Sequence, residues 1–417
     1  MIQRHTCENG LRIVTERIPS VRSVALGIWV GTGSKYESEK NNGISHFLEH
    51  MFFKGTATRT AKEIAETFDE IGGNVNAFTS KEYTCFYARV LDQHAPIALD
   101  VLADMFFHSV FDADELEKEK NVIIEEISMY EDTPDDLVHD LIARASYGAH
   151  PLGYTILGTE EVLRSLKRDD LQTYVEQRYL PGNTVVTVAG NFDDSLIEDI
   201  KQRFSSFHRA SQQLDLTTPG FAANVVSQQK KTEQAHFCLS LPGFQVGHED
   251  VYSLILLNNV LGGSMSSRLF QEIREERGLA YSVYSYHSSY KETGTFTVYT
   301  GTAQEHVGQV FDIVSQVLHD VADHGITDKE LKKGKEQLKG SLMLSLESTN
   351  SRMSRLGKNE LLLERHLSLD EILTKIDQVS HESVLAVGQQ LFRSKLALAM
   401  VSPLDGFPAN VKNDILL

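Results

Sequence analysis

The chain contains few cysteines. Only Cys7, Cys85 and Cys238 occur among its 417 residues. Their odd number and wide spacing fit neither a disulfide framework nor a zinc site built from cysteines. Any metal that this chain binds must therefore use nitrogen and oxygen ligands.

Long apolar runs and excess positive charge are also lacking. No stretch reaches the roughly eighteen apolar residues that cross a bilayer, and the first twenty residues contain no continuous apolar signal segment. The formal net charge is -18, which argues against binding to nucleic-acid phosphates. We therefore expect a cytoplasmic protein with no membrane or nucleic-acid partner.

The length and composition favour two folded domains. A chain of 417 residues with 41% hydrophobic residues can form substantial cores but exceeds the usual size of one domain. The stretch 207–233 is polar and has no sustained helical or strand periodicity. We therefore predict a first domain at 1–210, a linker at 211–232 and a second domain at 233–417.

The two halves share a weak internal repeat. Segment 168–190 recurs in pattern at 380–402, with an offset of 213 between Leu171 and Val384 (384 − 171). A second pair of helical segments aligns with an offset of 215, between Leu116 and Leu331 (331 − 116). Chance likeness between helices is the alternative, but similar offsets from separate segments favour duplication. We expect an α+β fold of two homologous domains.

The residues GISHFLEHMFFKGT, at 43–56, predict a short helix that Ser45 caps and Gly55 ends. His46 and His50 are four residues apart, so both imidazoles project from one face and can bind a single Zn²⁺. Glu49 lies beside the same face, where it can deprotonate the attacking water instead of binding the metal. This is the inverted form of the HExxH arrangement.

A third ligand is available in the downstream helical segment LEKEKNVIIEEISMYED. Glu119 and Glu126 are seven residues apart, two turns along one face, so one carboxylate can bind the metal while the other supports it. Taken singly, a histidine pair can be two ordinary histidines, and an acidic cluster is usually a solvated helix face. Together with Glu49, they favour a metal site with an open fourth position.

The second half contains no copy of this site. At the offset of 213, the positions of His46, Glu49 and His50 are occupied by Asn259, Gly262 and Gly263. The position of Glu126 falls at 339–341, where no carboxylate occurs. We therefore expect metal chemistry in the first half alone.

The motif His46-Phe-Leu-Glu49-His50, followed 76 positions later by Glu126 (126 − 50), resembles the pitrilysin/insulinase family of inverted zinc peptidases. The likeness is strongest to its bacterial branch related to the mitochondrial processing peptidase, and it covers nearly the whole chain. It implies one zinc per chain, held by His46, His50 and Glu126. It also implies that Glu49 activates the water and that Glu119 assists catalysis.

Two further sets of residues resemble functional segments of the family. Arg274 and Tyr281 match a pair that approaches the substrate carbonyl, where a cation and a phenol suit a developing oxyanion. The alternative is an ordinary helix salt bridge for Arg274 and a core position for Tyr281. The four residues Asn76-Ala77-Phe78-Thr79 resemble the edge strand to which family members add an extended substrate.

The resemblance implies one half of a clamshell made of two double-domain parts. It therefore predicts a homodimer in which Arg274 and Tyr281 of one subunit complete the zinc site of the other. We expect a zinc endopeptidase that acts on short peptides or unfolded polypeptide segments. The alternatives are a processing peptidase dedicated to one leader or pro-segment, a non-catalytic peptide-binding scaffold, and a purely structural metal site.

Overall fold

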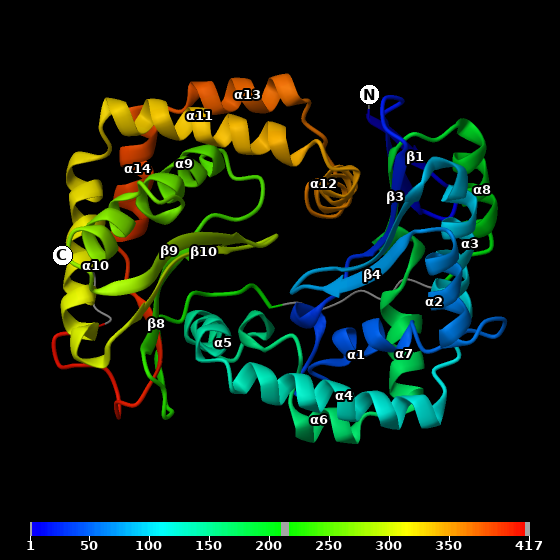
Figure 1. The fold of residues 1–417 in the computed structure, drawn as a ribbon, viewed down its shortest axis with the longest axis horizontal. Coiled ribbons are helices and arrows are strands. Elements are labelled where there is room, and N and C mark those ends of the chain that lie inside the picture. The colour runs from blue at the N-terminus through cyan, green and yellow to red at the C-terminus, as the bar shows by residue number, and fades with distance from the viewer. Residues whose placement is uncertain (1, 210–216, 413–417) are drawn as a thin grey trace. The chain divides into compact units, whose positions relative to one another are not determined.

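A computed structural model describes residues 2–209 and 217–412. These residues form two units by their contacts, and each unit contains one β-sheet covered by helices (Figure 1). Unit 1 takes its described residues from 1–127, 155–216 and 344–366, and unit 2 from 128–154, 217–343 and 367–417. In the described part of the chain, no helix has the length and apolar content to cross a membrane.

Unit 1 contains a six-stranded sheet with the order β1-β2-β6-β3-β5-β4. Its strands are β1 (Ile2–Thr6), β2 (Arg12–Arg17), β3 (Ser23–Val30), β4 (Asn74–Thr79), β5 (Thr84–Leu91) and β6 (Thr184–Gly190). Its helices are α1 (Ile44–Met51), α2 (Ala61–Glu70), α3 (Ala95–His108), α4 (Ala113–Glu131, which continues into unit 2), α6 (Glu160–Ser165), α7 (Arg168–Arg178), α8 (Asp194–Phe204) and α12 (Thr349–Leu362).

Both faces of this sheet are buried. Successive side chains of β3 point to opposite faces, with the period of two that a strand requires. Leu26 and Ile28 belong to the larger core, which also includes residues of α1, α3, α7 and α8. Ala25 and Trp29 belong to a smaller core on the opposite face, together with Met353 of α12. The helix α12 therefore completes unit 1.

Unit 2 contains a five-stranded sheet with the order β7-β11-β8-β10-β9. Its strands are β7 (Val225–Gln229), β8 (Ala235–Gly243), β9 (Ala280–Ser289), β10 (Gly294–Thr302) and β11 (Ala397–Ser402). Its helices are α5 (Pro134–Tyr147), α9 (Val251–Gly262), α10 (Val307–His324), α11 (Asp328–Ser345, which continues into unit 1), α13 (Leu369–Gln378) and α14 (His381–Phe392).

The second sheet repeats the first without β1. The strands β7, β11, β8, β10 and β9 take the places of β2, β6, β3, β5 and β4. The strand β2 is parallel to β6, and its counterpart β7 is parallel to β11. The other neighbouring strands that the two sheets share are antiparallel. The predicted α+β fold of two homologous domains is therefore confirmed.

Each unit is completed by a helix from the other half of the sequence. The helix α12, from the second half, packs on β2, β3 and β6, whereas α5, from the first half, packs on β7, β8 and β11. In Figure 1 the orange α12 belongs to the same unit as the blue β3, and the teal α5 to the same unit as the green β8. The predicted domains are contiguous, whereas the contact units exchange two segments: 128–154 belongs to unit 2 and 344–366 to unit 1.

Part of the predicted linker 211–232 forms the strand β7, which is an edge of the second sheet. Four of its five residues are exposed, so its side chains do not alternate between buried and exposed positions. A strand with this pattern lacks the period-two signal that identifies a strand in sequence. Residues 211–216 of the predicted linker lie outside the described residues.

The close packing of α12 on the sheet gives a stability prediction. A Cβ atom at Gly357 would lie 2.2 Å from Cε2 of Trp29, which is fully buried. We expect Gly357→Ala to lower the free energy of unfolding by about 1–3 kcal/mol, because an added methyl group overpacks this contact. Denaturant unfolding can be followed by the emission of Trp29, which is the single tryptophan of the chain.

Gly340 provides the matched control. It lies inside α11, and a Cβ atom there would meet no atom within 4 Å. Gly340→Ala should therefore raise the free energy of unfolding by up to about 1 kcal/mol, because alanine favours a helix more than glycine does. Equal effects of the two substitutions would contradict the packing of α12 described here.

Candidate metal centre and catalytic residues

The helix α1 carries His46, Glu49 and His50. Gly43 precedes it with a φ of 96°, and no side chain caps the helix from that position. The predicted cap, Ser45, is wrong, because its hydroxyl instead lies 2.9 Å from the hydroxyl of Tyr174. The helix also ends before the predicted stop, since its last residue is Met51 and the backbone turns three residues before Gly55.

Glu37, which sequence reasoning missed, holds the start of α1. Its carboxylate accepts hydrogen bonds from the backbone N–H groups of Gly43 at 2.7 Å and Ser45 at 2.9 Å, and from the side chain of Asn42 at 2.9 Å. Glu37 is 5% exposed, and burial raises the pKa of its carboxyl group while these three bonds lower it in part. A negative charge beside the N-terminus of a helix also interacts favourably with the helix dipole.

The three predicted metal ligands converge. The Nε2 atoms of His46 and His50 lie 3.7 and 3.8 Å from Oε2 of Glu126, a residue of α4. The ligand atoms of the three residues all lie within 4.8 Å of one another. No other group of this kind occurs among the residues that the structure describes.

The protonation of His46 suits a metal ligand. Burial, followed by the nearby His50, lowers the pKa of His46 to about 3, so its imidazole is neutral at neutral pH. Its Nδ1 atom is buried and has no hydrogen-bond partner among the described residues. Two imidazoles and one carboxylate form a ligand set that fits Zn²⁺ and leaves the fourth position open.

Glu119 lies outside this group of three and bonds to one of its histidines. One of its oxygens lies 2.7 Å from Nδ1 of His50, which places the proton on Nδ1 and leaves Nε2 free to bind. The other oxygen pairs with Nζ of Lys54 at 2.5 Å. Burial raises the pKa of Glu119, but the hydrogen bonds from His50 and Lys54 outweigh it and lower the pKa overall. Sequence reasoning did not identify Lys54.

Glu49 lies beside the ligands but is not one of them. Its Oε2 atom accepts a hydrogen bond of 2.5 Å from the hydroxyl of Thr79 at the end of β4. Burial raises the pKa of Glu49, and the bond from Thr79 lowers it in part. A raised pKa brings a carboxylate closer to the range that suits a general base.

The predicted substrate strand is an edge of the sheet. Asn76, Ala77, Phe78 and Thr79 lie in β4, which pairs with β5 on one side and is the last strand in the sheet order. The backbone N–H of Ala77 donates to the side-chain Oδ1 of Asn76 at 2.8 Å, so this donor does not bond to β5. The open edge of a sheet can accept an added strand.

Arg274 and Tyr281 meet in unit 2. Arg274 lies in a π-helical turn, Phe270–Glu275, and its guanidinium is 4.5 Å from the centroid of the Tyr281 ring. Its Nη1 also donates to the backbone carbonyl of Tyr281 at 3.0 Å. Tyr281 is 72% exposed, so the alternative that places it in the core is excluded. The pair is therefore available to a ligand.

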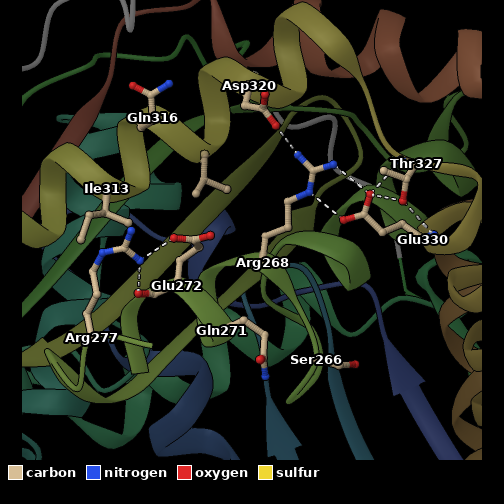
Figure 2. Close-up of a pocket in the computed structure, with 11 residues that line it drawn as sticks. Ser266, Arg268, Gln271, Glu272, Arg277, Ile313, Gln316, Asp320, Thr327 and Glu330 are labelled. Atoms are coloured by element: carbon tan, nitrogen blue, oxygen red, sulfur yellow. Dashed lines mark hydrogen bonds and ion pairs between the residues drawn. The ribbon is translucent and has the colours of Figure 1, made fainter. Parts of the chain in front are cut away.

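An ion-pair network holds the segment that leads into this turn. Arg268 donates to both carboxylate oxygens of Glu330, at 2.7 and 2.8 Å, and to Asp320 at 2.7 Å. Figure 2 shows these bonds in a pocket where the side chains of α10 and the start of α11 approach the turn. The network fixes the chain two residues before the π-helical turn that carries Arg274.

The corresponding helix of unit 2, α9, cannot hold such a site. Gly262 replaces Glu49 in the repeat, and a Cβ atom there would lie 2.3 Å from the backbone nitrogen of Ser285. The close approach of α9 to β9 thus excludes any side chain at this position. The prediction that the metal ligands occur in one half agrees with this packing.

Comparisons with known proteins agree with this organisation. Residues 12–160 match the family model described as insulinase (peptidase family M16), and residues 165–338 match the peptidase M16 inactive domain. The uncharacterized zinc protease YmxG of Bacillus subtilis is 58% identical over 98% of this chain and 100% of its own length. An uncharacterized zinc protease of Streptomyces coelicolor is 41% identical over 99% of this chain and 92% of its own length.

Solved structures show the same fold. A crystal structure described as a peptidase M16 inactive domain from Pseudomonas fluorescens superposes with a TM-score of 0.90 at 22% identity, covering 98% of this chain and 99% of that one. A protease from Helicobacter pylori superposes with a TM-score of 0.89 at 21% identity, covering 97% and 99%. With the sequence matches over nearly the whole chain, the comparisons establish that this protein belongs to the insulinase family of peptidases, family M16.

Proposed function

We propose that this protein is a zinc-dependent endopeptidase that hydrolyses extended peptides or unfolded polypeptide segments. The observation that carries the proposal is the convergence of His46, His50 and Glu126, with Glu49 beside them and outside the ligand set. Relatives that match nearly the whole chain are named zinc proteases, which supports zinc and peptide hydrolysis. A structural zinc site would need no carboxylate base at its open position.

Each residue then has a defined role. His46, His50 and Glu126 would hold zinc, which when bound would supply a Lewis acid to polarise the scissile carbonyl and lower the pKa of water. Glu49 takes the proton of the attacking water and delivers it to the leaving amine. Glu119 fixes the ring of His50 through Nδ1.

The proposed substrate binds as an added strand on β4. Backbone hydrogen bonds to an open edge recognise an extended chain without requiring one side-chain sequence. A folded protein presents few unpaired strands, so this mode favours short or unfolded peptides.

The proposed active form is a homodimer in which Arg274 and Tyr281 of one subunit approach the zinc site of the other. The support is that the pair is adjacent and that Tyr281 is exposed, so that a cation and a phenol are both presented. Such donors stabilise the oxyanion of the tetrahedral intermediate. A fully active monomer in sedimentation would contradict this part of the proposal.

Removal of the metal tests the proposed function. We expect a chelator to abolish cleavage of a long, internally quenched peptide, because the ligand set alone cannot polarise the carbonyl. One equivalent of zinc per chain should restore the activity, with metal content measured by elemental analysis. Full activity in metal-free protein, or no cleavage of any extended peptide by zinc-loaded protein, would contradict the proposal.

A further inference from the structure

The hydroxyl of Thr79 connects the edge strand to the catalytic carboxylate. Thr79 is the last residue of β4, and its Oγ1 lies 2.5 Å from Oε2 of Glu49 on α1. The hydroxyl of Thr79 is the donor of this bond and the carboxyl oxygen of Glu49 is the acceptor. This bond orients Oε2 and leaves Oε1 of Glu49 to receive the proton of the water.

We propose that Thr79 is a positioning residue that aligns Glu49 with a peptide bound on β4. The inference rests on the proposed function, because it assigns Glu49 the role of base. A hydrogen bond of this kind restricts the rotation of a carboxylate, and proton transfer depends on that alignment. The same residue thus ends the proposed binding strand and holds the base.

This link sets the position of the cleaved bond along the strand. Because Thr79 lies within one hydrogen bond of Glu49, the attacked carbonyl must lie opposite the Thr79 end of β4. The rest of β4, from Asn74 to Phe78, then pairs with peptide residues on only one side of that bond. At roughly 3.3 Å per residue, about five substrate residues cover this length.

A purely structural role for the hydroxyl is not required by its surroundings. The turn that follows β4 is held by other bonds, from the backbone N–H and the hydroxyl of Ser80, both at 2.9 Å from the carbonyl of Tyr83. Lys35 and Glu82 add a buried ion pair of 2.7 Å to the same turn. The backbone of Thr79 is also paired with Thr84 on β5.

The test compares Thr79→Val with Thr79→Ser in the zinc-loaded, full-length protein. Valine keeps the shape and the strand preference but removes the donor, so we expect kcat to fall by about 10- to 100-fold while KM changes less than about twofold. Serine keeps the donor and should retain most of kcat. The matched control is Thr84→Val, because the hydroxyl of Thr84 bonds to the carbonyl of Thr32 and not to Glu49.

Two further measurements do not require catalytic activity. Crystal structures of metal-free protein should show one orientation of the Glu49 carboxylate in the wild type and a displaced carboxylate in Thr79→Val. In a Glu49→Gln background, peptides shortened by five residues on one side should bind more weakly than peptides shortened equally on the other.

The outcomes separate this inference from the proposed function. A wild type that cleaves no extended peptide removes the proposed function, and the inference falls with it. An active wild type with unchanged kcat in Thr79→Val overturns the inference alone. Loss of zinc or of cooperative unfolding in Thr79→Val would assign the hydroxyl a structural role and would overturn it as well.

Discussion

Replacing Glu49 with glutamine should abolish most of the peptidase activity while zinc remains bound. The substitution preserves the size of the side chain and its oxygen acceptor for the hydroxyl of Thr79. It removes the carboxylate that accepts a proton, and general acid–base groups contribute about 10²- to 10⁴-fold to a rate. We therefore expect kcat to fall by about that factor, with one zinc per chain still present by elemental analysis.

Two other substitutions show whether the effect is specific to the base. Glu125→Gln changes a neighbouring acidic residue that is exposed on α4, and it should leave kcat and zinc content unchanged. His50→Gln removes a ligand and should lose both zinc and activity. Undiminished activity in Glu49→Gln would refute the assigned mechanism, whereas loss of its zinc would make Glu49 a ligand.

Separating the two halves of the sequence should prevent both from folding. Residues 1–216 without the rest of the chain lack α12, so the sheet face around Trp29 would be exposed, and α5 would have no sheet to cover. Burying one tryptophan removes roughly 200 Å² from water, or about 5 kcal/mol at 25 cal/mol per Å². This is comparable with the whole stability of a typical protein, which is about 5–15 kcal/mol.

Expression of residues 1–216 alone should therefore give insoluble protein, or protein in which Trp29 emits at the wavelength of an exposed indole. Co-expression with residues 217–417 as a second chain should restore soluble protein with buried Trp29 emission, because each part then supplies the helix that the other lacks. A soluble first half with cooperative unfolding and a buried tryptophan would contradict the exchange of helices.

The metal centre could be predicted from the sequence because its spacing is local. His46, Glu49 and His50 share one helix, and the period of that helix alone places them on one side. On another helix, the spacing of seven residues offered Glu119 and Glu126 as two candidates for the third ligand, and the family resemblance selected Glu126. A short-range pattern of this kind is independent of how the remainder of the chain folds.

The residues that support the site could not be predicted in the same way. Glu37 precedes α1 by seven residues and reaches back to its first N–H groups, so no periodicity identifies it. The bond from Thr79 to Glu49 joins residues 30 positions apart, and Lys54, three residues after the end of α1, pairs with Glu119 of α4. These contacts depend on the tertiary arrangement of α1, α4 and β4.

The fold shows the same limit. Helical periodicity predicts that α5 and α12 each bury one face, but it cannot tell which sheet covers that face. The internal repeat predicted two similar domains correctly, and the contact units differ from the contiguous predicted boundaries at the two exchanged segments. Sequence patterns thus identify surfaces that must be buried, and only long-range packing selects their partners.

The reciprocal places of α5 and α12 also bear on how this gene arose. The helix α5, from the first half of the sequence, packs on the second sheet, and α12, from the second half, packs on the first. The two helices cover corresponding strands of the two sheets. Exchange of identical elements between two copies of a chain is a low-cost route to a dimer. The exchange is thus the pattern expected if two copies of a one-repeat ancestor formed a domain-swapped dimer before their genes fused. After such a fusion the two repeats could diverge within a single chain, which would account for His46 and His50 on α1 where the second repeat has Asn259 and Gly263.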